Sequence, residues 1–125
     1  MTNRGIRLGG GGGDPHPHLP LKNCTITLHG DRMVNAINIQ YNNGHQMFLG
    51  KGGGNVSGPL TLNGNDHITE IEVRTGDMVD FISMKDNKGN RIQAGGGGGV
   101  HRKSGGRVDF ISISSGDAVD AIWIH

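Results

Sequence analysis

Two turns in the sequence place an aspartate four residues after a glycine. They read GDMVD from Gly76 to Asp80 and GDAVD from Gly116 to Asp120. Glycine and aspartate are ordinary turn-forming residues, so either turn alone could be purely structural. Each turn nevertheless combines a carboxylate, which accepts hydrogen bonds, with backbone N–H groups, which donate them. This combination can bind a pair of neighbouring hydroxyl groups, as sugar recognition requires.

An altered third copy of the turn occurs earlier in the chain. The segment from Asp31 to Asn35 reads DRMVN, so its opening glycine and its final aspartate are both replaced. The valines of the three copies, Val34, Val79 and Val119, are spaced by 45 and 40 residues. An internal repeat of this period therefore organises the chain.

Three glycine runs recur in register with this repeat and end at Gly13, Gly54 and Gly99. An isolated run of this kind is typical of a flexible linker, but the segments between these runs are too short to be independent domains. The runs also fail the spacing rules for dinucleotide-binding, phosphate-binding and calcium-binding glycine motifs. We interpret them as loops whose backbone N–H groups can approach a ligand without a Cβ in the way.

Apolar residues alternate with polar ones on both sides of each turn, which indicates β-strands, and no segment shows a helical period. The residues expected to face the core are Ile26, Leu28, Ile37, Ile39, Tyr41, Ile71, Val73, Ile82, Met84, Ile111, Ile113, Ile122 and Ile124. We predict an all-β protein in which the apolar faces of three similar antiparallel sheets pack against one another. Residues 1–125 are expected to form one domain with internal units at about 1–45, 46–90 and 91–125.

The composition argues against several classes of partner. Twelve basic and eleven acidic residues give a net charge of +1, so neither nucleic acid nor an anionic membrane surface is an expected partner. No apolar run is long enough for membrane insertion. Cys24 is the single cysteine, so we expect no internal disulfide and a small buried thiol.

The N-terminal segment MTNRGIRLGG lacks the apolar core of a signal peptide, although a mature sequence with an added Met would look the same. This leaves the cytoplasm and release by a non-classical route as alternatives. His16 and His18 could offer two metal ligands, but the sequence supplies no third ligand at a suitable spacing. We therefore expect no metal and interpret these histidines as part of a polar, proline-rich loop.

Enzymatic activity is not expected, because the sequence contains no recognisable pairing of a nucleophile with a base. The two aspartates of each turn belong to one tight loop. An acid and a base acting on opposite faces of a sugar could not be placed there.

The acidic turns, the glycine loops and the threefold layout together resemble those of the jacalin-related lectins over essentially the whole chain. The resemblance implies a β-prism I fold of three four-stranded Greek-key sheets, non-enzymatic carbohydrate binding without a cofactor, and a homo-oligomer (a dimer or higher). Trp123 alternates out of phase with Ile122 and Ile124, so it should face away from the core, where members of the family often form subunit contacts.

The resemblance also implies which residues bind, because each glycine loop of the family faces the acidic turn of the preceding unit. One implied site consists of Gly13, Asp117, Ala118 and Asp120. The other consists of Gly99, Asp77, Met78 and Asp80. In the family pattern the last aspartate accepts hydrogen bonds from the O4 and O6 hydroxyls of a hexose, and the backbone N–H groups hold the ring oxygen, O6, and O3 or O4.

A third site, consisting of Gly54, Arg32, Met33 and Asn35, is expected to be weak or inactive. Asn35 can accept a hydrogen bond only without the assistance of a negative charge. Asp31 is also expected to be a poor replacement for the opening glycine of the turn.

The resemblance favours mannose- or glucose-containing glycans and glycoproteins over galactose. Galactose-binding members are typically cleaved just before the glycine loop and carry aromatic residues in the acidic turn. Here residues 1–8 run continuously into the loop, and the turn positions are Met78 and Ala118. The alternative is a structural or protein-interaction module that uses the same scaffold without binding sugar.

Overall fold

The alternating segments form strands that bury every second side chain. In the computed structural model, which describes residues 6–15, 18–104 and 106–125, strand β4 (Cys24–Gly30) buries Cys24, Ile26, Leu28 and Gly30. Strand β8 (Ile68–Thr75) buries Ile71, Val73 and Thr75 in the same alternation. The described residues contain no helix, and hence none long and apolar enough to cross a membrane.

Three antiparallel sheets share one strand order. The first sheet has the order β6 (Gln46–Gly50), β5 (Val34–Tyr41), β4 and β7 (Asn55–Leu62). The second has the order β10 (Arg91–Gly95), β9 (Val79–Asp86), β8 and β11 (Val100–Lys103). In both sheets three consecutive antiparallel strands form a meander, and the fourth strand returns to lie beside the first. This is the Greek-key arrangement.

The third sheet is assembled from both ends of the chain. Its order is β1 (Ile6–Gly9), β13 (Val119–Ile124) and β12 (Phe110–Ser115), and its fourth position is shared by β2 (Asp14–Pro15) and β3 (Leu19–Pro20). The sheets therefore divide the chain in a different phase from the sequence units. Each sheet contains one acidic turn and one glycine loop. In the third sheet the loop connects β1 to β2 and the turn connects β12 to β13, so the two come from opposite ends of the chain.

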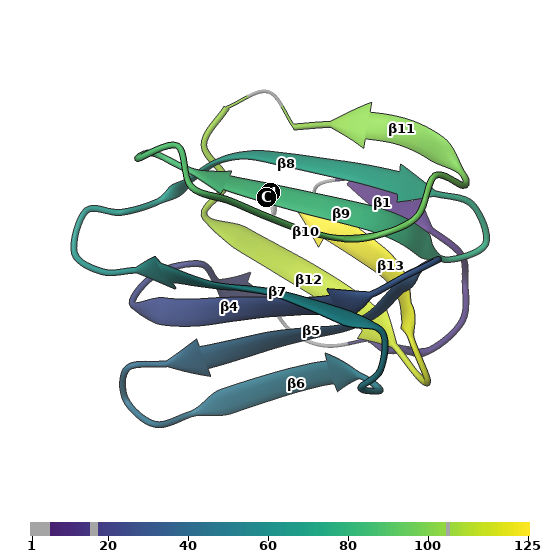
Figure 1. Ribbon diagram of the computed structural model, residues 1–125, viewed down its shortest axis with the longest axis horizontal. Helices are drawn as coiled ribbons and strands as arrows, with labels where there is room; N and C mark the ends of the chain where they lie inside the picture. The colour runs from purple at the N-terminus through teal and green to yellow at the C-terminus, as the bar shows by residue number, and fades with distance from the viewer. Residues whose placement is uncertain (1–5, 16–17, 105) are drawn as a thin grey trace, which may run out of the picture.

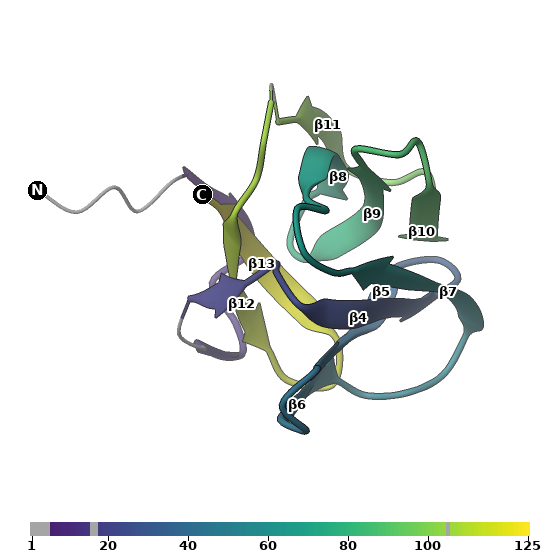
Figure 2. The same ribbon diagram turned by 90° about the vertical axis from the view of Figure 1, so that its left-hand side faces the viewer.

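The sheets form the sides of a three-sided prism, as predicted (Figure 2). Their inner faces share one hydrophobic cluster, which is built mainly from Ile, Val and Leu. The residues predicted to face the core are fully buried, except that Tyr41 and Ile124 are partly buried and pack against its edge. Trp123 is half-buried and lies outside the cluster, in agreement with its predicted outward orientation.

Cys24 lies in the core and is a free thiol, as expected. Its burial raises the pKa of the thiol to about 11, so it is protonated and unreactive at neutral pH.

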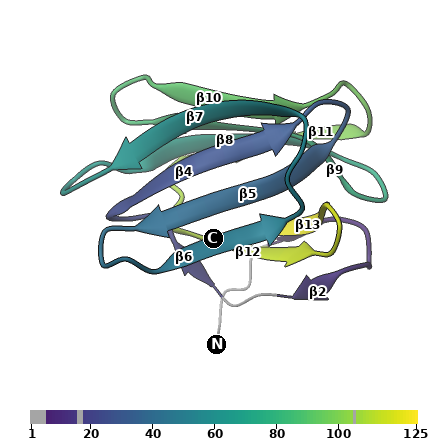
Figure 3. The same ribbon diagram turned by 60° about the horizontal axis from the view of Figure 1, so that its bottom comes forward.

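The strands run along the prism, which brings all three acidic turns and all three glycine loops to one end. The turns are the β4–β5, β8–β9 and β12–β13 connections, at the right of Figure 1. Figure 3 shows the face of the first sheet and the loop from β6 to β7 at the same end. Residues that are far apart in the sequence can therefore form common sites there.

Candidate functional site

A β-bulge places the last residue of each acidic turn. In the second sheet Arg74 pairs with Phe81 and Thr75 pairs with Val79, so Asp80 is the extra residue between them. The third and first sheets have the same irregularity, with Asp120 and Asn35 as the extra residues. A bulge leaves one residue out of the regular pairing and redirects its side chain.

The bulge explains the apolar spacing that follows each turn. Val79 and Ile82 are both fully buried although they are three residues apart, which a regular strand would not allow. Val119 and Ile122 repeat this spacing. The core therefore anchors the strand on both sides of the aspartate, and the carboxylate remains half-exposed at the end of the prism.

Each glycine loop is hydrogen-bonded to the bulge of its own sheet. The amide of Gly10 donates to the carbonyl oxygen of Asp120 (3.0 Å), and the amide of Gly96 donates to that of Asp80 (2.9 Å). In the first sheet the amide of Lys51 donates to Asn35 (3.0 Å). These three bonds are equivalent, so they fix each loop relative to its acidic turn by the same backbone contact.

Gly13 and Asp120 lie side by side, as the family resemblance implies. Gly13 has a φ of 77°, and a Cβ at this position would collide with the carboxylate of Asp120. Only glycine can therefore bring a backbone amide this close to the carboxylate without strain. Ala118 and Asp117 complete the turn, which is closed by a hydrogen bond from the Gly116 amide to the Ala118 carbonyl (3.0 Å).

Gly99 and Asp80 repeat this geometry in the second sheet. Gly99 has a φ of 78°, and a Cβ on it would lie 2.6 Å from Asp80 Oδ2. The turn through Asp77 and Met78 is closed by a hydrogen bond from the Gly76 amide to the Met78 carbonyl (3.0 Å).

Both of these sites have hydrogen-bonding groups that the described part of the chain does not satisfy. The carboxylates of Asp80 and Asp120 form no hydrogen bond or ion pair with any described residue. The amides of Gly13 and Gly99 likewise donate no hydrogen bond among the described residues. Acceptors and donors therefore lie next to one another, exposed to solvent, with the complementarity that a sugar's hydroxyl groups need.

The third site also places its glycine loop beside its turn, but it differs in its chemistry. The expected loop residue, Gly54, lies beside Gly30 and Asp31. Gly53 lies beside Asn35: a Cβ on this glycine would be 3.5 Å from Asn35 Nδ2. The carboxylate of Asp31 accepts a hydrogen bond from the amide of Asn55 (3.0 Å), so this carboxylate already has a partner. Arg32 and Met33 lie in the turn.

Asp31 itself is accommodated in the turn, contrary to the expectation from the sequence. The equivalent glycines, Gly76 and Gly116, do not have a φ in the left-handed region, so the backbone there does not require glycine. What the third turn lacks is the closing hydrogen bond: no described bond joins the Asp31 amide to the Met33 carbonyl.

Neighbouring sites are in direct contact. A Cβ on Gly10 would overlap the carbonyl group of Asp77, so the loop of the Asp120 site packs against the turn of the Asp80 site. A Cβ on Gly96 would lie 2.8 Å from the carbonyl oxygen of Arg32, in the turn of the third site. The sites therefore form a continuous rim at the end of the prism.

Two features of the sites were missed in the sequence. The bulge could have been detected, because the apolar spacing changes from two residues to three at each aspartate. The contacts of Arg74 and Ser114 with the glycine loops could not have been detected in the sequence, because they depend on how each loop folds back over its own sheet. Ser114 donates to the carbonyl of Gly12 (2.8 Å), and Arg74 donates to those of Gly97 and Gly98 (3.1 Å each).

Only one histidine of the predicted pair, His18, lies among the described residues. His16 lies outside the described residues, and the ring of His18 packs against those of His125 and Phe110, with centroids 4.2 and 6.4 Å away. Within the described ranges no three His, Cys, Asp or Glu side chains converge as a metal site requires.

Comparison with known proteins places the chain in a family. The sequence profile of the jacalin-like lectin domain matches residues 7–125. The comparison with curated protein sequences found no match.

Solved structures with the same fold include several plant lectins. A Malaysian banana lectin superposes with a TM-score of 0.84 at 17% identity, over 99% of this chain and 96% of that one. A mannose-binding lectin from champedak gives 0.74 at 20% identity, over 100% and 98% of the two chains. A mannose-binding jacalin-related lectin from Ananas comosus gives 0.75 at 19% identity, over 95% and 94%. These likenesses establish the predicted β-prism I fold.

Proposed function

The chain belongs to the family of jacalin-like lectin domains, whose activity is carbohydrate binding, and from this we propose that it is a multivalent lectin for mannose- or glucose-type glycans. Its two competent sites are centred on Asp80 and Asp120. The observation that carries the proposal is that, in two of the three sheets, a carboxylate lies beside a glycine amide and neither group has a hydrogen-bond partner among the described residues.

A hexose would use these groups in a defined way. The carboxylate of Asp80 or Asp120 accepts hydrogen bonds from two neighbouring hydroxyls, and these bonds are strengthened by the negative charge. The amides of Met78 or Ala118 and of the loop glycine donate to the oxygens on the other side of the ring. The proposed role is binding alone, without a covalent step.

The preference for mannose or glucose rests on the turns and on the structures with the same fold. Met78 and Ala118 provide no aromatic ring on which the apolar face of galactose could stack. The champedak and Ananas comosus lectins, which share the fold, are both mannose-binding. We therefore propose terminal mannose or glucose on glycoproteins as the ligand.

A homo-oligomer would multiply these sites. Trp123 is half-buried on β13, next to the edge strand β1. We propose that a second copy packs against this edge of the third sheet. Shallow sites of this kind bind monosaccharides with Kd values of ~1 mM, so several sites per particle are needed for firm attachment to a glycosylated surface.

Glycan-array binding of the pure protein tests the proposal. The wild type should bind mannose- or glucose-terminated glycans, and the double variant Asp80→Asn, Asp120→Asn should lose this binding while it remains folded. A matched control is Asp66→Asn, Asp109→Asn, which removes two negative charges at the opposite end of the prism and should bind normally.

If the wild type binds no such glycan, a second candidate gains support: a protein-interaction module on the same scaffold. The altered third site favours it, because the fold there tolerates the loss of the aspartate. Full binding by the double variant would instead show that the site assignment is wrong.

A further inference from the structure

In two of the three sheets, a side chain from the strand that enters the acidic turn contacts the glycine loop. It belongs to the next-to-last residue of that strand. These residues are Arg74 in the second sheet and Ser114 in the third, and His29 is their equivalent in the first. All three lie at the bulge, opposite the residue that follows Asp80, Asp120 or Asn35. From this position the side chains of Arg74 and Ser114 reach the glycine loop.

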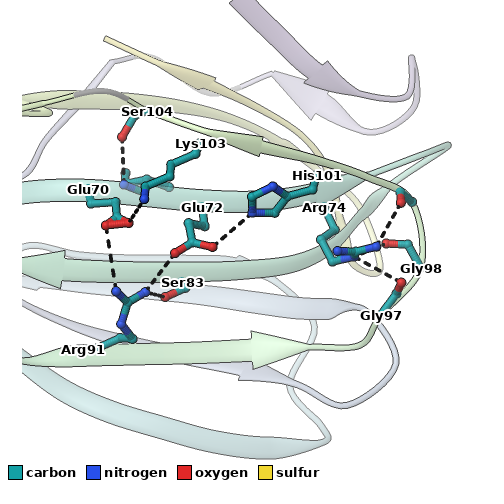
Figure 4. A network of polar contacts seen from close by, with 12 residues as sticks. Glu70, Glu72, Arg74, Ser83, Arg91, Gly97, Gly98, His101, Lys103 and Ser104 are labelled. Carbon is teal, nitrogen blue, oxygen red and sulfur yellow. Dashed lines mark hydrogen bonds and ion pairs between the residues drawn. The ribbon is translucent and has the colours of Figure 1, made fainter.

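Arg74 binds the loop through its carbonyl groups. Its Nε donates to the carbonyl oxygens of Gly97 and Gly98 at 3.1 Å each, and its Nη2 lies 3.5 Å from that of Gly99. Figure 4 shows the guanidinium group of Arg74 directed at the carbonyls of Gly97 and Gly98. Ser114 Oγ donates to the carbonyl oxygen of Gly12 at 2.8 Å.

Gly12 and Gly98 are equivalent, because each directly precedes the last glycine of its loop. In a trans peptide the C=O of one residue and the N–H of the next point in opposite directions. Among the described residues the Gly58–Pro59 peptide is the only cis bond, so both loop peptides are trans. When the carbonyl of Gly98 is held by Arg74, the amide of Gly99 must point away from Arg74.

The first sheet shows the loop without such a contact. The ring of His29 packs edge-on against Phe48, with the centroids 5.5 Å apart, and no described hydrogen bond joins His29 to the loop. Gly53, the equivalent of Gly12 and Gly98, has a φ of 128°, whereas neither of those two has a φ in the left-handed region. The loop without a donor therefore has a different backbone conformation.

We propose that Arg74 and Ser114 are positioning residues, which fix the loop peptides so that the amides of Gly99 and Gly13 are presented to a sugar. The proposal rests on the function proposed above, since it assigns a role within the same two sites. Preorganised donors bind more tightly than mobile ones, because binding does not have to order them. It follows that each site can be weakened separately by a residue that does not touch the ligand.

Site-resolved NMR tests this with methyl α-mannoside as the probe. In the wild type, both the Gly13 and Gly99 amide signals should shift on titration. Arg74→Ala should weaken binding at Gly99 about tenfold, the order of one charge-assisted hydrogen bond, and leave Gly13 unchanged. Ser114→Ala should do the opposite, so each variant is the control for the other.

Two further measurements separate positioning from other roles. Arg74→Lys and Arg74→Gln should both recover part of the affinity, because each can still donate to a carbonyl. In the ligand-free protein, the order parameters of the Gly97–Gly99 amides should fall from about 0.85 to below about 0.6 in Arg74→Ala.

The proposal is overturned if Arg74→Ala leaves the affinity at Gly99 unchanged, or if both sites weaken equally. Recovery by lysine but none by glutamine would also overturn it, because the charge and not the hydrogen bond would then matter. If the wild type binds neither methyl α-mannoside nor methyl α-glucoside, the proposed function fails, whereas the order parameters still report whether Arg74 fixes the loop.

Discussion

The aspartate of each acidic turn owes its position to the two buried residues around it. Val79 and Ile82 anchor the strand in the core on either side of Asp80, and Val119 and Ile122 do so around Asp120. The bulge between them turns the carboxylate out of the sheet. The side chain at this position is therefore free to vary chemically without disturbing the core, and Asn35 occupies the same position in the first sheet.

This freedom predicts that the third site can be restored. In the variant Asp31→Gly, Asn35→Asp the acceptor regains its charge, and the competing carboxylate next to it is removed. We expect the Gly54 amide signal to shift on titration with methyl α-mannoside, as those of Gly13 and Gly99 do, but with weaker affinity because no side chain holds the loop carbonyl. NMR titration measures the three loops separately.

The single variant Asp31→Gly is the control, and its Gly54 signal should not respond. A silent Gly54 signal in the double variant would show that the conformation of Gly53 and not the missing carboxylate disables the third site.

Much of the candidate site could be predicted at this scale, although only by resemblance. The pairing of Gly13 with Asp120 joins residues from opposite ends of the chain, which no local pattern reveals. The structure brings these residues together as the family layout implies. The hydrogen bond from Asn55 to Asp31 and the contacts of Arg74 and Ser114 could not be predicted, because they depend on the folded path of each loop.

At the level of elements, the hairpin between β9 and β10 depends on a buried carboxylate. Asp86 is 1% exposed and accepts hydrogen bonds from the amides of Lys88 and Asn90 and from the side chain of Asn90. Its burial alone would raise its pKa, but the hydrogen bonds from Asn90 and Lys88 outweigh this effect and hold the pKa below its usual value.

A depressed pKa in the folded protein makes the hairpin's stability depend on pH. The contribution of the ionised Asp86 is fully present above the unfolded pKa of about 3.9 and is lost as the pH falls through the lower folded value. We therefore expect Asp86→Asn to lower the thermal unfolding midpoint at pH 7 by several degrees. The difference from the wild type should shrink below pH ~4, as measured by circular dichroism.

Asp109→Asn provides the comparison for this experiment. It removes one partner of an exposed ion pair with Arg107, and such pairs contribute little to stability. A constant difference between wild type and Asp86→Asn down to pH 2 would show that the hydrogen bonds do not depend on the charge of Asp86.

The elements were predictable from the period of two, but their grouping was not. Strands such as β4 and β8 follow directly from alternating apolar residues. The sheets divide the chain at other positions than the sequence units do, because each glycine loop lies in the same sheet as the acidic turn of the preceding unit. For the loop that ends at Gly13, this is the turn at the other end of the chain. The short strands β2 and β3 carry no alternation at all and are defined only by their pairing with β12.

For the whole molecule, the decisive feature is that the two proposed sites lie at one end of the prism. The packing of Gly10 against Asp77 fixes the loop of one site to the turn of the other, so their separation and relative orientation are set by the backbone. Two sites held in this way can attach to the same glycosylated surface at once. The second attachment is then favoured by a high effective concentration and not by new contacts.

Single-site variants should therefore separate affinity from avidity. Asp80→Asn or Asp120→Asn should leave the other site's affinity for methyl α-mannoside unchanged, because each site has its own carboxylate and its own loop. On a dense mannose-coated surface, however, each variant should dissociate about tenfold faster or more, since one weak attachment replaces two. Surface plasmon resonance on high- and low-density mannose surfaces measures this directly. A loss of only twofold at both densities would mean that the two sites act independently, so the common end of the prism would confer no advantage in binding.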